Sequence, residues 1–271
     1  MKRLLGLLVV STLAGLLTSA LAAPAALPDN VAEAIKTQPL NPNWPAPYKP
    51  KSRRDFTGMW DDVGSGGWDA VNRPGPTQKP PYTAAFMPIW RKLLDNLEKG
   101  TPSNNPAADC LPQGMPRIMH FSHPGEITQN DHQVNIYAEW NEQMRRIYTD
   151  GRPFSLDNGP TYYGQSSGHW EGDALVATTV GIRGDTNLEG SGMPHSDALV
   201  VYEKIWLADD NTLKDEITLV DRKAFTHPWV VTRTYQRMKA GEQVMPYVCL
   251  ENNRNPQDAS GATTVVLHGN N

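Results

Sequence analysis

Cysteine is scarce in this chain: only Cys110 and Cys249 occur among its 271 residues. Two cysteines this far apart lack the ligand spacing of a metal site, and we discount a site built on them. If the chain enters an oxidising compartment, the two thiols are expected to form one disulfide. In the chain-entropy model, closing so long a loop stabilises the fold by roughly 4 to 5 kcal/mol.

An excess of positive charge is also missing, since 25 Lys and Arg residues face 29 Asp and Glu residues. The formal net charge of −4 does not favour nucleic acid or an anionic membrane surface as a partner. The sequence has no P-loop, no G-x-G-x-x-G motif after a predicted strand and no H-E-x-x-H motif. We therefore predict no cofactor, no bound metal and no nucleic-acid partner.

Only one long apolar run is present, over residues 4–21, and it follows Lys2 and Arg3. It ends in small residues next to Ala22, which is the pattern of a cleavable signal peptide. A membrane anchor would need a basic flank after the apolar run, whereas prolines and an aspartate follow here. The sequence predicts a signal peptide over 1–22 and a periplasmic or secreted mature protein without a transmembrane segment.

The mature chain is expected to consist of an extended arm rich in Pro and Asn over 23–55 and one domain over 56–271. Apolar residues recur at helical spacing over 83–99, which predicts a single helix. From residue 117 onward, short strand-like segments alternate with turns. The predicted strands are 117–121, 125–129, 133–140, 143–149, 161–171, 173–182, 198–208, 212–220, 229–238 and 244–250.

This succession of short strands with few helical crossovers predicts a mostly β fold. An antiparallel meander of this length tends to close on itself, because closure removes its exposed edges. The fold class expected is therefore a calycin-like or lipocalin-like barrel, with the one helix packed outside it or capping one end. A β-sandwich is the alternative architecture.

The hairpin around 209–211 predicts buried charge. A turn with Asn211 in the left-handed conformation pairs Ala208 with Thr212, and this register sorts apolar from polar side chains cleanly. Glu203 and Asp215 then lie on the apolar face, where an unpaired charge is costly. The counter-ion predicted for both is Arg233 on the next strand. The cluster is either a polar site at the floor of a ligand cavity or a structural ion network.

The hairpin around 141–142 has one apolar face and one mixed face. The apolar face comprises Val134, Ile136, Ala138, Trp140 and Ile147. The mixed face comprises Asn135, Tyr137, Glu139, Met144, Arg146 and Tyr148. Because a solvated face is rarely so aromatic, we expect the mixed face to line a cavity, with Glu139 and Arg146 forming a diagonal ion pair.

Two motifs suggest chemistry but lack its usual context. Residues 164–168 match the G-x-S-x-G pattern of a serine hydrolase, with Asp221 and His227 as partners in the right chain order, yet a strand follows where a helix is required. His169, Glu171 and Asp173 alternate near a hairpin tip, as metal ligands can, but a polar turn explains them equally well. His169 is kept as a candidate ligand-binding residue.

The histidines near strand ends are candidates for acid or base groups. His195 follows the glycine-rich loop 190–194, which resembles a lid over a barrel mouth, and we expect His195 to be a mouth residue. Trp229 is expected close to it. Tyr235 shares the inner face of the Arg233 strand.

Several stretches resemble a family of uncharacterised exported proteins of proteobacteria and acidobacteria. They are C-L-P-Q-G-M-P-R-I-M, R-R-I-Y-T-D-G-R, G-H-W-E-G-D-A-L-V-A-T-T-V-G-I, P-H-S-D-A-L, A-F-T-H-P-W-V-V-T-R-T-Y and C-L-E-N-N-R-N. The resemblance runs from Cys110 to Asn255 and implies export, but no activity. Gln165 stands where family members often carry histidine, which weakens any role that needs a histidine there.

The sequence favours an exported barrel that binds a small, partly apolar or aromatic molecule. The ligand-binding residues predicted are Tyr137, Glu139, Arg146, Tyr148, His169, Trp229 and Tyr235. The alternative is a cofactor-independent lyase or isomerase with His195, Glu203, Asp215 and Arg233 as acid and base groups. A serine hydrolase and a structural envelope protein are further hypotheses. The sequence does not decide whether the protein is an enzyme.

Overall fold

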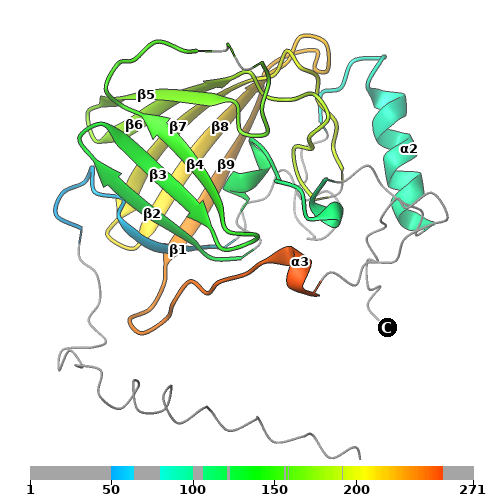
Figure 1. Cartoon of the computed structure of the whole chain (residues 1–271). Helices are drawn as coiled ribbons and strands as arrows, with labels where there is room; N and C mark the ends of the chain where they lie inside the picture. Colours follow the sequence, from blue (N-terminus) through cyan, green and yellow to red (C-terminus); the bar gives the residue numbers. More distant parts are fainter. Residues whose placement is uncertain are drawn as a thin grey trace, which may run out of the picture. The chain divides into compact units, whose positions relative to one another are not determined.

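The structure is a computed structural model that describes residues 50–63, 80–99, 106–120, 123–155, 157, 159–190 and 192–252 (Figure 1). All of them belong to one unit of the chain, 45–271. The predicted signal peptide and the predicted arm up to residue 49 lie outside the described residues. No helix in the described part of the chain is long and apolar enough to cross a membrane.

Nine strands form a closed barrel in which β1 pairs with β9 (Figure 1). Each strand also pairs with the next one along the chain. The fold prediction of a mostly β, closed barrel is therefore confirmed. The strands are β1 (Gly58–Asp62), β2 (Gly125–Asn130), β3 (Gln133–Ala138), β4 (Gln143–Tyr148), β5 (Gln165–Glu171), β6 (Ala174–Val180), β7 (Val200–Asp209), β8 (Thr212–Val220) and β9 (Trp229–Arg237).

Alternation of side chains along the strands builds the core. In β3, for example, Val134, Ile136 and Ala138 are buried while the residues between them are partly exposed. The same alternation runs through β7, β8 and β9, since successive side chains of a strand point to opposite faces. The predicted register of β7 and β8 is confirmed: Lys204 pairs with Glu216 and Ile205 with Asp215.

The hairpin tip between β7 and β8 differs from the prediction. Asp209 pairs with Thr212, and the register shifts between Leu207 and Asp209, so Ala208 is a bulge residue. Asn211 is not among the described residues with positive φ. The bulge takes up the extra residue that the prediction placed in the turn, so the strand register is the same.

One pair of neighbouring strands breaks the antiparallel pattern. β4 and β5 run parallel and share only two paired positions, Ile147 with Ser166 and Tyr148 with Ser167. The connection over 149–164 returns the chain to the end of the barrel where β4 began, so β5 runs in the same direction. The barrel is thus mixed, and the β4–β5 seam is its most sparsely paired contact between strands.

Two predicted strands are wrong. Residues 117–121 contain a 3₁₀ turn, η2 (Arg117–Met119), and η1 (Pro106–Asp109) is a second one. Residues 244–250 form no strand and end in the short helix α3 (Cys249–Asn252). The latter segment makes one isolated bridge, between Trp140 and Tyr247. Neither segment finds a sheet edge to join, because the barrel is already closed.

The predicted helix is present as α2 (Met87–Glu98) and begins four residues later than expected. Phe86, Met87 and Trp90 pack against the hydrophobic core. The segment before the helix is joined to the β8–β9 loop, where Thr83 N donates to Ala224 O at 2.8 Å. The ring of Tyr82 lies 5.3 Å from that of Phe225.

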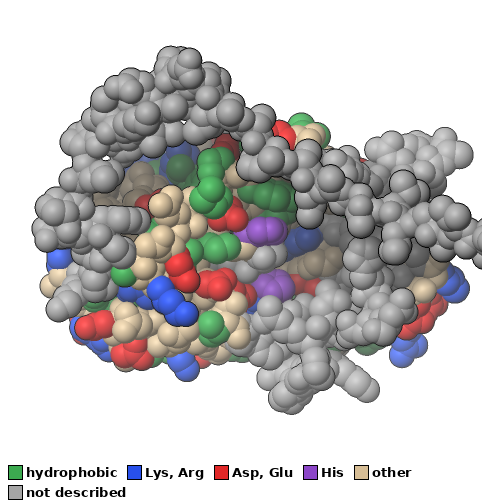
Figure 2. Space-filling model, turned by 90° about the horizontal axis from the view of Figure 1, so that it is seen from below, with side chains coloured by type: hydrophobic (Ala, Val, Ile, Leu, Met, Phe, Trp, Pro, Cys, Tyr) green, Lys and Arg blue, Asp and Glu red, His purple; other side chains and the backbone are tan. Residues whose placement is uncertain are grey.

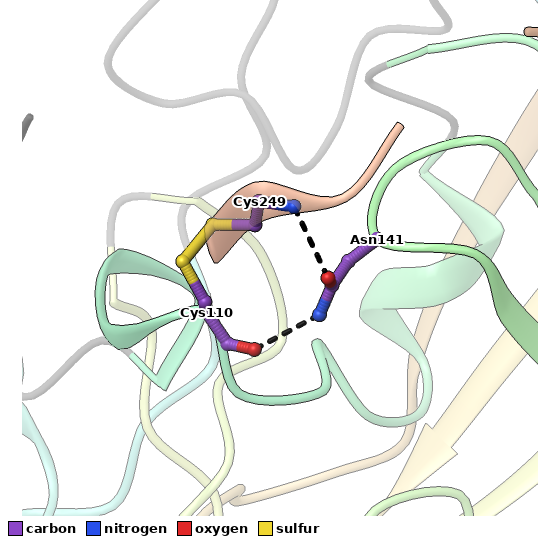
Figure 3. Close-up of a disulfide and its surroundings, with 3 residues drawn as sticks. All are labelled: Cys110, Asn141 and Cys249. Atoms are coloured by element: carbon purple, nitrogen blue, oxygen red, sulfur yellow. Dashed lines mark hydrogen bonds between the residues drawn. A yellow bond between two sulfur atoms is a disulfide. The ribbon is translucent and has the colours of Figure 1, made fainter. Parts of the chain in front are cut away.

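The predicted disulfide is confirmed between Cys110 and Cys249 (Figure 3). Asn141, in the turn between β3 and β4, lies between the two bonded segments. Its Nδ2 donates to Cys110 O at 2.9 Å, and its Oδ1 accepts from Cys249 N at 3.3 Å. The disulfide and Asn141 together fasten the segment after β9 to the barrel.

Candidate functional site

A belt of polar side chains runs around the inside of the barrel. Seven consecutive strands of the ring, from β4 through β9 to β1, each contribute one inward-facing member, and all are at least nine-tenths buried. The members of this polar belt are Arg145, Ser166, Thr179, Glu203, Asp215, Arg233 and Asp62. So many buried polar groups are uncommon in a barrel core and need mutual partners.

Arg145 organises the first half of the belt. Its Nη1 donates to Oε1 of Glu203 at 2.7 Å, and its Nη2 donates to the other carboxylate oxygen. Nη2 also donates to Oγ1 of Thr179 at 3.1 Å, and Nε donates to Oγ of Ser166 at 3.3 Å. The two hydroxyl groups lie 2.7 Å apart. This bidentate pairing compensates part of the cost of burying both charges.

Arg233 organises the second half. Its Nη2 donates to Oδ2 of Asp62, and Nε2 of His120 lies 3.8 Å from the same oxygen. The His120 side chain is 16% exposed, so this half approaches solvent there. Burial raises the pKa of Tyr235, and its hydroxyl donates to Met119 O at 2.6 Å.

Asp215 lies between the halves and is fully buried. Neither of its carboxyl oxygens receives a hydrogen bond from a donor group of the described residues. Burial, followed by the negative charge of Glu203, raises the pKa of Asp215 well above its ordinary value of 3.8. A raised pKa favours the neutral, protonated form of Asp215 beside the carboxylate of Glu203. The belt then carries two positive and two negative charges.

The predicted interior cluster is partly right. Glu203, Asp215 and Arg233 all point inward, but Glu203 pairs with Arg145 and Arg233 pairs with Asp62. Arg233 is therefore not the shared counter-ion. Side chains two residues apart on a strand share a face. The inward position of Ile147 therefore implies an inward Arg145, and the inward position of Trp60 implies an inward Asp62. That signal in the sequence could have found both residues.

A pocket of about 310 Å³ lies at the β4–β5 seam, and we call it the seam pocket. One side is formed by Met144, Arg146 and Tyr148 of β4, and the other by residues between Ser155 and Gln165. Arg145 and Ser166 also line it, which brings the polar belt to its floor. The pocket lies beside the two paired positions that join the parallel strands β4 and β5.

Hydrogen bonds hold the walls of the seam pocket in place. The Tyr163 hydroxyl donates to Oε1 of Gln143, and Ser155 N donates to Oε1 of Gln165. The guanidinium of Arg152 lies 3.9 Å from the ring centre of Tyr148. A preformed wall of this kind reduces the entropic cost of binding.

Larger hollows occur elsewhere on the described surface but do not reach the belt. One of about 670 Å³ is lined by Lys51, Arg54, Asp55 and Trp170, among others, and one of about 530 Å³ lies over β7 and β8. Figure 2 shows a face on which acidic, basic and histidine side chains lie among apolar ones. The seam pocket alone among these hollows includes belt residues.

The mixed face of β3 and β4 points out of the barrel, which corrects the expectation that it lines the interior. Tyr137 is on the outer surface, and Glu139 accepts a hydrogen bond from Met245 N at 2.8 Å instead of pairing with Arg146. The segment after β9 thus covers part of this face. Arg146 and Tyr148 do line a pocket, but it is the external seam pocket.

His195 is not a mouth residue, because only 3% of it is exposed. Its Nε2 lies 2.8 Å from Oγ1 of Thr186, and its Nδ1 donates to Ser196 O at 2.9 Å. Burial lowers the pKa of His195 and favours the neutral ring. The surrounding loop is folded inward through Ser196, whose backbone and hydroxyl both donate to Asp221.

Trp229 and Tyr235 point inward from β9 as expected, but they pack in the core. The ring of Trp229 lies 5.8 Å from that of Phe225. His169 is an exposed residue that pairs with Glu171 at 3.0 Å. Among the described residues, no three His, Cys, Asp or Glu side chains are arranged to hold a metal ion.

The serine hydrolase arrangement is not assembled. Ser166 faces Arg145 inside the barrel, while Asp221 accepts hydrogen bonds from Ser196, Lys223 and Ala224. His227 is exposed and contacts Thr226. The G-x-S-x-G pattern here is part of a strand, so its serine lacks the base that activates a nucleophile.

The comparisons with known proteins add no assignment. No family model matches the chain, and no curated protein matches its sequence. The resemblance to an exported family stays a prediction.

Proposed function

We propose that this protein is an exported barrel that binds a small, partly apolar or aromatic molecule in the seam pocket. The observation that carries the proposal is the meeting of the pocket with Arg145 and Ser166 of the polar belt. Two tyrosines and a methionine supply apolar surface above this polar floor. Binding sites for small molecules typically combine apolar walls with a few fixed polar groups.

The disulfide supports the exported location. Disulfides persist in oxidising compartments, and the two cysteines of this chain are bonded to each other. The apolar run over residues 4–21 after two basic residues is the signal expected for export.

A second candidate function is a cofactor-independent lyase or isomerase. The supporting observation is that burial raises the pKa of Asp215, while the neighbouring Glu203 is bonded to Arg145, which lines the pocket. In heavy water, a proton transferred between these groups and a bound substrate would be replaced by deuterium. An enzyme of this kind should incorporate deuterium into a bound substrate, and Asp215→Asn should abolish that incorporation, whereas a carrier incorporates none.

The binding proposal can be tested with a panel of ring compounds on the purified mature protein. Isothermal titration calorimetry with p-cresol, 2-naphthol, 4-hydroxybenzoate, 4-hydroxybenzamide and tyramine should find at least one ligand. Met144→Trp should lower its affinity about tenfold by filling the pocket. Val230→Trp is the matched control, since Val230 is also an exposed strand residue but lies on β9.

The expected result is about tenfold weaker binding in Met144→Trp and unchanged binding in Val230→Trp. If no compound of the panel binds, or if both variants bind as the wild type does, the seam pocket is not the site proposed.

A further inference from the structure

The charged residues that line the seam pocket all carry one sign. They are Arg145 and Arg146, and none of the described lining residues is Asp or Glu. The charge of Arg145 is matched by Glu203. Arg146 is exposed, and no described residue pairs with it. One guanidinium therefore remains uncompensated at the pocket.

The neighbours of Arg146 do not neutralise it. Across the sheet it faces Asn135 on β3, an uncharged amide. On its own strand the side chains of the same face are Met144 and Tyr148. Arg152, whose guanidinium lies over the ring of Tyr148, is already paired with Asp150, Nε to Oδ1 at 2.9 Å. None of the described residues that line the pocket offers a carboxylate that would compete with an entering anion for Arg146.

The apolar surface next to Arg146 suits a ring. Tyr163 is half-buried and its hydroxyl is held by Gln143, so its ring cannot swing away without losing that bond. Tyr148 is held from the other side by Arg152. A volume of about 310 Å³ is at the small end of ligand sites, which suits a molecule with one ring.

We infer that the seam pocket takes a small aromatic carboxylate, with the carboxylate on Arg146 and the ring between Tyr148, Tyr163 and Met144. Arginine matches a carboxylate with two parallel N–H donors, and aromatic side chains bind a ring by stacking or edge contact. This inference rests on the proposed function and specifies its ligand class.

Three probes that share a phenol ring and differ in charge test the inference. In calorimetric titrations at low ionic strength, 4-hydroxybenzoate should bind about tenfold tighter than neutral 4-hydroxybenzamide, because only the anion forms charge-assisted hydrogen bonds with Arg146. The cation tyramine should bind more weakly than both. Raising the salt concentration should reduce the difference in affinity between the charged probes and the neutral one, because the pocket is open to solvent and salt screens the charges.

Variants of Arg146 identify the group responsible. Arg146→Gln should lower the affinity for 4-hydroxybenzoate about tenfold and leave 4-hydroxybenzamide unchanged. Arg146→Lys should retain part of the preference, because it keeps the charge but not the paired donors. Arg222→Gln is the matched control, since Arg222 is also exposed and no described residue pairs with it. Circular dichroism checks that each variant is folded.

Two results would overturn the inference and leave the proposed function standing: equal affinity for the three probes, or an unchanged preference in Arg146→Gln. Binding of none of the five panel compounds contradicts both. Tighter binding of 4-hydroxybenzoate that Arg146→Gln abolishes and Arg222→Gln preserves supports the inference.

Discussion

Arg145 on β4 reaches past β5 and β6 to hold the carboxylate of Glu203 on β7 at two points, with Nη1 2.7 Å from Oε1. Both side chains are almost fully buried, and hydroxyl groups of the two intervening strands bond the same guanidinium. A single ion pair thus links four strands across the most sparsely paired seam of the barrel.

The first prediction concerns this ion pair. Arg145→Ala leaves the Glu203 carboxylate buried without its partner, so the free energy of unfolding should fall by about 3 to 5 kcal/mol. The neighbouring Arg146→Ala is the control and should change stability by no more than about 0.5 kcal/mol, because Arg146 is exposed and pairs with no described residue. Urea unfolding measures both. If Arg145→Ala loses no more stability than Arg146→Ala, the ion pair between Arg145 and Glu203 contributes little to the stability of the fold.

The second prediction concerns the proton on Asp215. Because the folded-state pKa of Asp215 is raised, the folded protein holds a proton that the unfolded chain releases above the ordinary pKa of 3.8. Stability should therefore fall as pH rises from that value towards the raised one, by up to about 1.4 kcal/mol per pH unit. Asp215→Asn lacks this proton and should lack this slope.

The measurement is urea unfolding of the wild type and Asp215→Asn at several values of pH upward from the ordinary pKa of 3.8. The stability of the variant relative to the wild type should increase with pH. A difference that does not vary with pH would mean that Asp215 is ionised in the folded protein.

The third prediction tests the packing of the seam. Gly164 and Gly159 both line the seam pocket with positive φ, 61° and 70°, so alanine is strained at either position. A Cβ on Gly164 would lie 2.3 Å from Val180 O, whereas one on Gly159 meets nothing within 4 Å. Gly159→Ala should cost about 1 to 2 kcal/mol, and Gly164→Ala about 1 to 3 kcal/mol more. Thermal or urea unfolding measures both variants, and the difference between their losses of stability gives the cost of the steric clash at Gly164.

The fourth prediction concerns the disulfide. Alkylation of the unreduced, denatured protein should find no free thiol, because the two cysteines are bonded to each other. The double variant Cys110→Ser with Cys249→Ser should lose about 2 to 5 kcal/mol of stability. Reduction of the wild type should produce a similar loss, and reduction of the variant none. Two labelled cysteines in the unreduced protein would contradict the bond.

Local pattern was enough to predict part of the site. The alternation along β7 and β8 predicted the strand register although the turn between them differs, and with it the inward position of Glu203 and Asp215. The alternation along β9 predicted the inward position of Arg233. These predictions succeed because the strands are adjacent in the chain and a shift of one residue would expose the apolar set. Cysteine number and the predicted compartment likewise indicated the disulfide.

The sequence by itself determined strands β2 to β9 to within a few residues and the sorting of their side chains into two faces, but it did not predict β1. Only the tertiary structure decided which face of β3 and β4 points inward. The mixed face can point outward because the segment after β9 covers part of it. It also decided the partners of Glu203 and Arg233, and the parallel seam with its pocket. These features depend on strands brought together by ring closure and by the 149–164 connection, and periodicity within a strand carries no information about such distant pairings.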